Sequence, residues 1–572
     1  MRIRTFAIVV NDCCQPFELR NSNLVIDAQN FFYHCYKDSN LRYELGAESD
    51  RYAKYLRQYL SMFKEANIKC YFIFKGGTEN LEKKIEKDRK NPEKAENGTH
   101  NPIFMNNIHL QVLDEMEFDY VFSEFQAKTD CIALAKKLCC PVLSMDIEFA
   151  LSGVPYIPLN SLKFDANQKI LNCKLFMLNT LLEKFSIDKD KLAAFILVTD
   201  LNIFPEDSFT NFFKRNRMSP FPTYKRNENL LCWLSKNPIN KIMHEISSNT
   251  TIENERIIEE LDKCKNLVNG VVVRSLAIAC ILREDVENTS WFEKGVALTH
   301  IAKPYVDLYR SKTLLVTGNP DEEAENSISV SLNIIKYAYD LLTNFENDGF
   351  KFIYNHFDTN FHEQLVDHSI SKPTYQANSC VFENGWDNIR YLNLFQHFMI
   401  EEVHFDFRTL ENAPDDAKML LMALVYFNHK KSDNTSKIAY SVLLSHVILS
   451  VLDENDDVKI VSAADSQLVA KLLKAYFNVT EFELISIKNM KLYHPLLEFQ
   501  LCLKELNNLN KLCGSPFEPT IYSKTYNGTF VYKIVNSMQN EDELQFINKI
   551  LEPVPTVFHI VNHLINIYQS LL

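Results

Sequence analysis

The sequence L-V-I-D at residues 24–27 begins the pattern that decides the fold. This short apolar run ends in an aspartate, and a helical pattern from about Asp50 to Ala66 separates it from a second apolar run, C-Y-F-I-F at residues 70–74. The alternation then continues with an apolar run at 119–123, a helical pattern at about 126–138 and an apolar run at 141–144. Strands that alternate with helices predict a mostly parallel sheet with helices on both faces.

Helical patterns dominate the sequence beyond about residue 206. The clearest of them are Asp416–His429, Ile438–Leu452, Ser462–Phe477 and Thr556–Leu572. A chain of 572 residues is longer than one hydrophobic core usually organises. We therefore expect an α/β domain at residues 1–205 and a mainly α-helical region at residues 206–572.

Composition narrows the class of protein. Hydrophobic residues make up 46% of the chain and charged residues 24%, as in soluble globular proteins. The longest apolar stretches, such as Ile438–Leu452, are shorter than the roughly 20 residues that cross a bilayer, so we expect buried helices and no membrane partner. The first residues contain no convincing signal peptide, which favours an intracellular protein.

The net charge and the pattern of cysteines and histidines argue against two further classes of protein, one that coats duplex DNA and one that contains a zinc site. The net charge of −13 argues against non-specific coating of duplex DNA, so any contact with nucleic acid is expected to be local. The fourteen cysteines form no CxxC pair, and the histidines of the middle of the chain, His356, His362, His368, His397 and His404, lack the four-residue spacing of a helical zinc site. We expect both residue types to be structural.

Most residues at the predicted strand ends are acidic. The carboxyl ends of parallel strands are where ligands bind in such sheets. The residues found there are Asp27, Lys75, Glu124, Asp146 and Glu148. Carboxylates that converge from separate strands are typical of a two-metal phosphodiesterase site, where two Mg²⁺ ions lie roughly 4 Å apart. The alternative for each residue alone is a helix cap, because aspartate is also common there.

Four segments together resemble a known family. They are L-V-I-D at 24–27, F-K-G-G at 74–77, residues 122–135 and C-P-V-L-S-M-D-I-E-F at 140–149. In order and spacing they resemble the asteroid branch of the flap-endonuclease relatives, over roughly residues 1–205. The resemblance implies a PIN-like nuclease fold, a structure-specific DNA nuclease or a relative of one, Mg²⁺ or Mn²⁺ as the cofactor, and a nuclear location.

The resemblance also implies roles for single residues. Asp27 matches the first metal-ligand aspartate of the family, and Asp146 and Glu148 match a later acidic pair. Asp130 matches the last acid of a cluster that reads acid-x-acid-x-acid in the family. Asp27, Asp130, Asp146 and Glu148 are therefore the candidate catalytic residues and metal ligands.

Three of the positions that depart from the family pattern concern its acidic residues. Gln126 and Lys128 stand where the first two acids of the cluster are expected, and Lys75 replaces the aspartate of the family's D-G-G motif. We expect the Lys75 ammonium to pair with Asp27 or Asp146 and to take the place of a metal cation. The alternative is that Lys75 points into solvent while the remaining acids still bind an ion.

Two basic segments are candidate DNA contacts. In related nucleases a helical arch that handles single strands follows the D-G-G strand, and here that region contains Lys83, Lys84, Lys87 and Arg89. The second segment contains Lys214, Arg215 and Arg217 beside aromatic residues that could stack on bases. The alternatives are a solvated helix face for the first segment and phenylalanines docked on the core for the second.

These observations leave three functions open. The first is a nuclease-like protein that recognises overhangs, flaps or branched DNA but has a partly eroded metal site and little or no catalysis. The second is an active endonuclease in which Mg²⁺ or Mn²⁺ activates water. The third is an interaction scaffold that binds protein partners through its helical region and has no nucleic-acid role.

Overall fold

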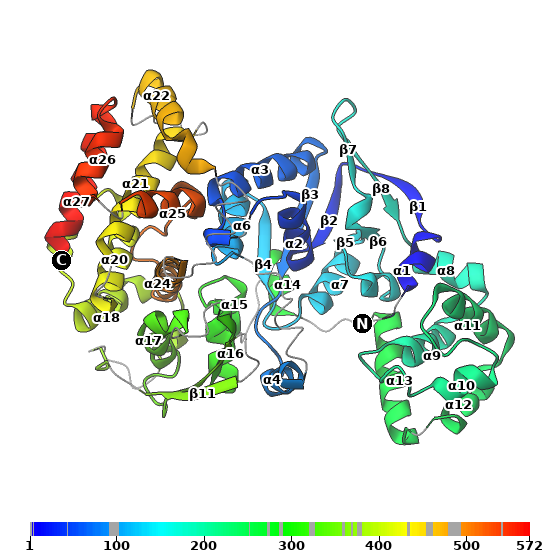
Figure 1. The fold of residues 1–572 in the computed structure, drawn as a ribbon. Coiled ribbons are helices and arrows are strands. Elements are labelled where there is room, and N and C mark those ends of the chain that lie inside the picture. Colours follow the sequence, from blue (N-terminus) through cyan, green and yellow to red (C-terminus); the bar gives the residue numbers. More distant parts are fainter. Residues whose placement is uncertain are drawn as a thin grey trace. The chain divides into compact units, whose positions relative to one another are not determined.

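The protein consists of two compact units in the computed structural model (Figure 1). The structure describes residues 3, 5–42, 44–90, 102–250, 252–270, 275–284, 290–319, 326–356, 361–367, 370–373, 380–431, 435–453, 461–478, 493–538 and 541–572. Unit 1 comprises Met1–Cys35, Gln58–Lys75 and Phe118–Val286. Unit 2 comprises Tyr36–Arg57, Gly76–Glu117 and Glu287–Leu572.

A five-stranded parallel sheet forms the centre of unit 1. Its strand order is β4-β3-β2-β5-β6, and every pair of neighbours is parallel. The strands are β2 (Ser22–Asp27), β3 (Ile68–Phe74), β4 (Asp119–Phe122), β5 (Val142–Ser144) and β6 (Tyr156–Pro158). The register pairs Asp27 with Ile73, and Ile26 with Leu143, so β2 and its two neighbours end at one edge.

Aromatic and aliphatic side chains fix the helices on this sheet. Phe72 of β3 is fully buried, and its ring lies 5.6 Å from Phe31 and 5.7 Å from Phe32, centroid to centroid. Both phenylalanines belong to α2 (Ala28–Asp38). The helix α7 (Ala127–Leu138) packs against β2, β3 and β5. The packing of α2 and α7 therefore holds the residues at the strand ends in place.

Unit 1 continues with a small antiparallel sheet and a group of helices. The sheet has the order β1-β8-β7, formed by β1 (Gln15–Leu19), β7 (Lys163–Asp165) and β8 (Ile170–Leu175). The helices are α1 (Phe6–Asn11), α8 (Leu178–Phe185), α9 (Lys189–Thr199), α10 (Thr210–Arg215), α11 (Tyr224–Lys236), α12 (Ile239–Ser248), α13 (Asn254–Asn269) and α14 (Leu276–Ile281). α9 is buried from Leu192 to Thr199 and packs against α11, α12 and α13, so it is the core of this group.

Unit 2 is mainly helical. Its helices are α4 (Leu81–Lys90), α6 (Met105–Glu115), α15 (Trp291–Ala297), α16 (Lys303–Ser311), α17 (Leu332–Leu342), α18 (Leu394–Val403), α19 (Phe407–Leu410), α20 (Asp415–Lys430), α21 (Thr435–Leu452), α22 (Ala463–Leu473), α24 (Tyr493–Leu512), α25 (Gly528–Ser537), α26 (Glu543–Leu551) and α27 (Pro555–Leu571). The first residues of α3 (Ser49–Glu65) also belong to this unit. α24 packs against α17 and α20, and α21 packs against α25 and α27.

The apolar helix α21 lies inside unit 2. Its 18 residues have a mean hydropathy of 1.5, which meets the length and composition of a membrane span, but 78% of that stretch is buried in the protein. This burial agrees with the expected core helix.

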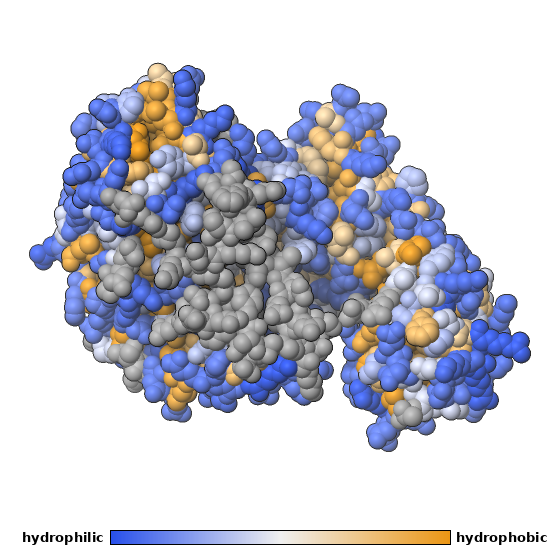
Figure 2. Space-filling view, viewed as in Figure 1, coloured by the Kyte–Doolittle hydropathy of each residue, from blue (hydrophilic) through white to orange (hydrophobic). Residues whose placement is uncertain are grey.

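On the face drawn in Figure 2, hydrophobic residues also gather over α22, where Leu468 and Leu472 are partly exposed.

The predicted fold class is confirmed. The four predicted strands correspond to β2, β3, β4 and β5, and a mainly helical region follows the sheet domain. The sequence did not lead us to expect the β1-β8-β7 sheet or a second small sheet in unit 2, formed by β9 (Thr313–Asn319), β10 (Phe350–His356) and β11 (Phe361–Val366). The compact units combine segments that are distant in the sequence, so the domain boundary at residue 205 stays a prediction.

The substitution Phe72→Ala tests the aromatic packing of unit 1. Phe72 is fully buried among aromatic rings, so its loss leaves a cavity and should lower the free energy of unfolding by about 3–5 kcal/mol. Chemical denaturation followed by tryptophan fluorescence and circular dichroism measures this change. The control Phe221→Ala removes a ring that is 71% exposed and should change stability by less than about 0.5 kcal/mol. Equal losses for the two variants would contradict this account of the core.

Candidate functional site

Asp27 is the last residue of β2 and is only 6% exposed. Its Oδ2 accepts a hydrogen bond from the Ser144 hydroxyl at 2.7 Å and one from the Asn30 amide at 2.5 Å. Burial raises the pKa of Asp27, the two hydrogen bonds oppose this effect, and the nearby charge of Asp146 adds to it. The protonated form of Asp27 is therefore favoured over a wider range of pH than in a solvated aspartate.

Ser144 connects Asp27 to the second acidic segment. The Ser144 Oγ accepts a hydrogen bond from the Asp146 backbone N–H at 2.9 Å while its proton goes to Asp27. Asp146 then caps the 3₁₀ helix η2 (Ile147–Leu151), because its Oδ1 accepts from the Glu148 N–H at 3.0 Å. This cap explains how two acids separated by one residue are held in a fixed geometry beside β5.

Lys128 supplies a positive charge to this acidic pair. It lies in the first turn of α7, and its Nζ is 3.5 Å from the Asp146 Oδ2 and also forms an ion pair with Glu148. The side chains of Lys128, Asp146 and Glu148 are 23%, 28% and 13% exposed, so water screens the three charges only in part. We call Lys128, Asp146 and Glu148 the ion-pair cluster.

Asp130 lies two residues after Lys128 on α7. It is 8% exposed, and its Oδ2 accepts a hydrogen bond from the Ser123 hydroxyl at 2.5 Å. Burial raises the pKa of Asp130, and hydrogen bonds from Ser123 and Ser275 oppose the shift. The buried Cys131 beside it has a pKa raised by burial and also by the charges of Asp27 and Asp130, which places both aspartates near one thiol.

The expected role of Lys75 is wrong. Lys75 follows the last residue of β3 and is exposed, and it has no ion pair among the described residues. The position of a lysine in the sequence does not determine the direction of its side chain. Here Lys128 of α7, and not Lys75, reaches the carboxylates of Asp146 and Glu148. The sequence had singled out Lys128 as a departure from the acidic cluster, but it had not predicted the pairing of Lys128 with Asp146 and Glu148.

Within the part of the chain that the structure describes, no group of three or more histidine, cysteine, aspartate or glutamate side chains is arranged to hold a metal ion. The donor chemistry agrees with this finding. Mg²⁺ needs several oxygen ligands around one point, whereas oxygens of Asp146 and Glu148 face the Lys128 ammonium. One oxygen of Asp27, Oδ2, already accepts two hydrogen bonds. The side chains in this arrangement do not fit a divalent ion.

The first basic segment forms α4 in unit 2. Lys83 and Lys84 are exposed, and the side chain of Lys87 lies outside the described residues. Arg89 pairs with Glu363 at 2.5 Å and lies 5.6 Å from the centre of the Phe361 ring. Arg89 is therefore engaged within the protein, whereas Lys83 and Lys84 present their ammonium groups to solvent.

The second basic segment lies in and after α10 in unit 1. Lys214, Arg215 and Arg217 are all exposed, and Arg215 lies 3.7 Å from Glu245. Phe212 and Phe213 are 0% and 1% exposed, so they belong to the core and do not form a stacking platform. For Phe212 and Phe213 the alternative prediction, phenylalanines docked on the core, is therefore confirmed.

Family models match both ends of the chain. The model described as the XPG N-terminal domain matches residues 3–96, and the model described as the Asteroid N-terminal domain matches residues 455–572. The first match covers the strands β2 and β3 and supports the predicted PIN-like fold.

Similar proteins and structures carry names from the same group. The single-strand DNA endonuclease ASTE1 of Mus musculus is 22% identical over 100% of this chain and 91% of its own length. The protein asteroid of Drosophila melanogaster is 31% identical over 26% of this chain and 18% of its own length. A solved structure of the catalytic core of Rad2 in complex with DNA substrate is 13% identical with a TM-score of 0.32, over 48% of this chain and 88% of that one.

The substitution Lys128→Met tests the ion-pair cluster. It leaves two partly buried carboxylates close together without a cation, so it should lower the free energy of unfolding by about 1–3 kcal/mol. The control Lys137→Met lies on the same helix and breaks a pair with Glu284 in which both side chains are 46% exposed. That change should cost at most about 1 kcal/mol. Chemical denaturation of both variants measures the difference, and equal losses would contradict the role of Lys128.

Proposed function

Because the chain belongs to the asteroid family within the XPG-like nuclease group, we propose that it binds DNA ends or branched DNA and has lost most or all of its metal-dependent cleavage. One observation carries the proposal. The Lys128 ammonium lies among the carboxylates of Asp146 and Glu148, where a nuclease of this family is expected to hold a divalent cation.

The electrostatics of the cluster support the loss of catalysis. A metal ion would have to displace the ammonium from both carboxylates and recruit Asp27, whose pKa is raised by burial. Gln126 and Lys128 also remove two of the acids that the family pattern would supply. When bound, a divalent ion supplies an activated water and stabilises charge on phosphate. The residues of this chain instead hold this edge of the sheet together by ion pairing and by the Ser144 hydrogen bonds.

The name of the mouse relative supports DNA as the partner. That protein is named a single-strand DNA endonuclease, and its similarity extends over the whole of this chain. On this protein, Lys83 and Lys84 of α4 and Lys214 and Arg217 near α10 are exposed cations available to phosphates, whereas the exposed Arg215 already lies beside Glu245. With a net charge of −13, these local groups rather than a general field must attract DNA.

An active endonuclease is the second candidate. It is favoured by the retention of Asp27, Asp146 and Glu148 and by the name of the mouse relative. In that case Lys128 must leave the carboxylates when metal and DNA bind, and Asp27, Asp130, Asp146 and Glu148 would hold the ions.

A binding and cleavage assay separates the two candidates. Purified protein is incubated with Mg²⁺ or Mn²⁺ and labelled overhang, flap or splayed DNA at low salt. We expect a shift of the DNA in gel electrophoresis and no cleavage, with the same pattern for Asp146→Asn. Cleavage by the wild type that Asp146→Asn abolishes would overturn the proposed loss of catalysis, and failure to bind any of the substrates would favour a protein scaffold.

The substitution Lys128→Asp restores an acid to the cluster. It removes the competing ammonium and adds oxygen ligands, so we expect the variant to gain Mn²⁺ binding that the wild type lacks. Isothermal titration calorimetry measures the binding without any need for activity. The matched control is Lys137→Asp, which makes the same change of charge at an exposed position of the same helix and should create no metal site.

The double variant Lys83→Gln/Lys84→Gln tests the first basic segment. If both ammonium groups contact phosphates, the slope of log affinity against log salt concentration should fall by about 1–2. Fluorescence anisotropy with a labelled flap substrate at several salt concentrations measures this slope. An unchanged slope would remove α4 from the DNA-binding surface.

A further inference from the structure

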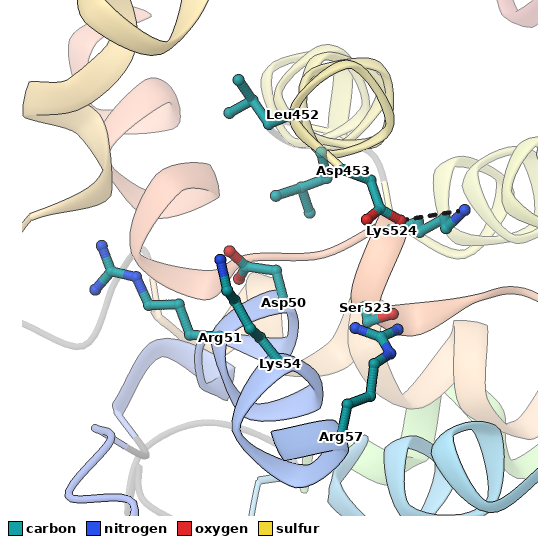
Figure 3. A pocket seen from close by; sticks show the side chains of 9 residues that line it. Asp50, Arg51, Lys54, Arg57, Leu452, Asp453, Ser523 and Lys524 are labelled. Atoms are coloured by element: carbon teal, nitrogen blue, oxygen red, sulfur yellow. Dashed lines mark ion pairs between the residues drawn. The ribbon is translucent and has the colours of Figure 1, made fainter. Parts of the chain in front are cut away.

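A pocket of about 240 Å³ in unit 2 is lined by an excess of positive side chains (Figure 3). Its cations are Arg51, Lys54 and Arg57 of α3 and Lys524 of η8 (Tyr522–Lys524). Two carboxylates, Asp50 and Asp453, share the lining with these four cations. This pocket contains none of the carboxylates of the candidate metal site. Its positive character stands out in a chain whose net charge is −13.

Arg57 is oriented by a hydrogen-bond network behind it. Its Nε donates to the Glu115 Oε2 at 2.8 Å, and the other oxygen of Glu115 accepts from the Gln111 amide at 2.7 Å. The same amide nitrogen donates to the Ser523 Oγ at 2.5 Å. Neither Glu115 nor Gln111 lines the pocket, so the network fixes Arg57 and Ser523 from outside it.

The unused donors of this network face the pocket. The bond to Glu115 takes only the Nε of Arg57, and its two terminal nitrogens have no partner among the described residues. Figure 3 shows the Arg57 guanidinium directed toward Ser523. A guanidinium held in this way presents a planar pair of N–H groups that matches two oxygens of a phosphate or carboxylate.

The two acids of the lining leave the positive character in place. Asp453 pairs with Lys524 at 3.2 Å, and its side chain is 14% exposed. Burial raises the pKa of Asp50, whose Oδ1 accepts a hydrogen bond from the Asn527 amide at 2.7 Å. Even with both acids ionised, the four cations of the lining outnumber its two carboxylates.

The size and chemistry of the pocket limit its ligand. We propose that it binds a phosphomonoester, with the phosphate oxygens held by Arg57, Ser523 and Lys524. A volume of about 240 Å³ holds a phosphate and part of a sugar, but it is below the roughly 300–1,000 Å³ of pockets that enclose drug-sized ligands. Leu449 and Leu452 give the pocket an apolar wall against which a sugar or base can lie.

Calorimetric titration with adenosine 5′-monophosphate tests the proposal, with adenosine as the ligand that lacks the phosphate. We expect the full-length protein to bind the monophosphate and not the nucleoside. Arg57→Gln and Lys524→Gln should each weaken the binding roughly tenfold or more, because each removes a charge-assisted hydrogen bond. Arg57→Lys should restore it only in part, since an ammonium lacks the planar pair of donors.

The matched control is Arg283→Gln, which removes an arginine of unit 1 that is 87% exposed and should leave the affinity unchanged. Thermal unfolding confirms that each variant is folded. The proposal is overturned if the folded wild type does not bind the monophosphate, or if both Arg57→Gln and Lys524→Gln bind it as the wild type does. Because the ligand is a free nucleotide, this result is independent of whether the protein binds or cleaves DNA.

Oligonucleotides then identify the source of the phosphate. A single strand with a 5′-phosphate is compared with the same strand ending in a 5′-hydroxyl. A preference for the phosphorylated strand that Arg57→Gln abolishes assigns the pocket to strand ends. Equal binding of the two strands, with monophosphate binding retained, assigns it to a free nucleotide.

Discussion

The parallel pairing of β2 between β3 and β5 is the constraint on which the candidate site depends. The two registers bring the ends of these strands to one edge of the sheet, where Asp27 and Ser144 meet. A shift of one residue in β2 would turn Asp27 to the other face of the sheet and bring an apolar residue to the site. The buried aromatic contacts between α2 and β3 oppose such a shift, so the hydrophobic core determines where the polar groups lie.

Placing carboxylates at a buried edge has an electrostatic cost that the surrounding residues must offset. Asp27 is stabilised by two hydrogen bonds and by easier protonation, whereas Asp146 and Glu148 are stabilised by an ammonium. A divalent ion would offset the same cost in an active nuclease. The presence of Lys128 means that the fold of the site can persist without a metal, which separates the stability of this edge from any catalytic use of it.

The sequence predicted the elements of the sheet because their signals are local. Apolar runs that end in polar residues identified β2, β3, β4 and β5, and the acids at strand ends identified Asp27, Asp146 and Glu148. The β1-β8-β7 sheet was missed because β7 has only three residues and because β1 pairs with β8 across more than a hundred residues. The prediction assigned the pairing cation to Lys75 from its position at a strand end, but that position does not determine the direction of the side chain. The packing of α7 instead brings Lys128 to the carboxylates.

The ion-pair cluster and the Arg57 pocket use the same charges in different geometries. In the first, the carboxylates of Asp146 and Glu148 both pair with the Lys128 ammonium, so the attraction is satisfied inside the protein. In the second, Glu115 binds Arg57 through its Nε from behind, and the remaining donors stay available. An acid can thus either neutralise a cation or orient it, according to which face of the cation it occupies. This chain has more acidic than basic residues, so many of its cations have an acid nearby. Whether such a cation can bind a phosphate then depends on which of its N–H donors the acid leaves unused.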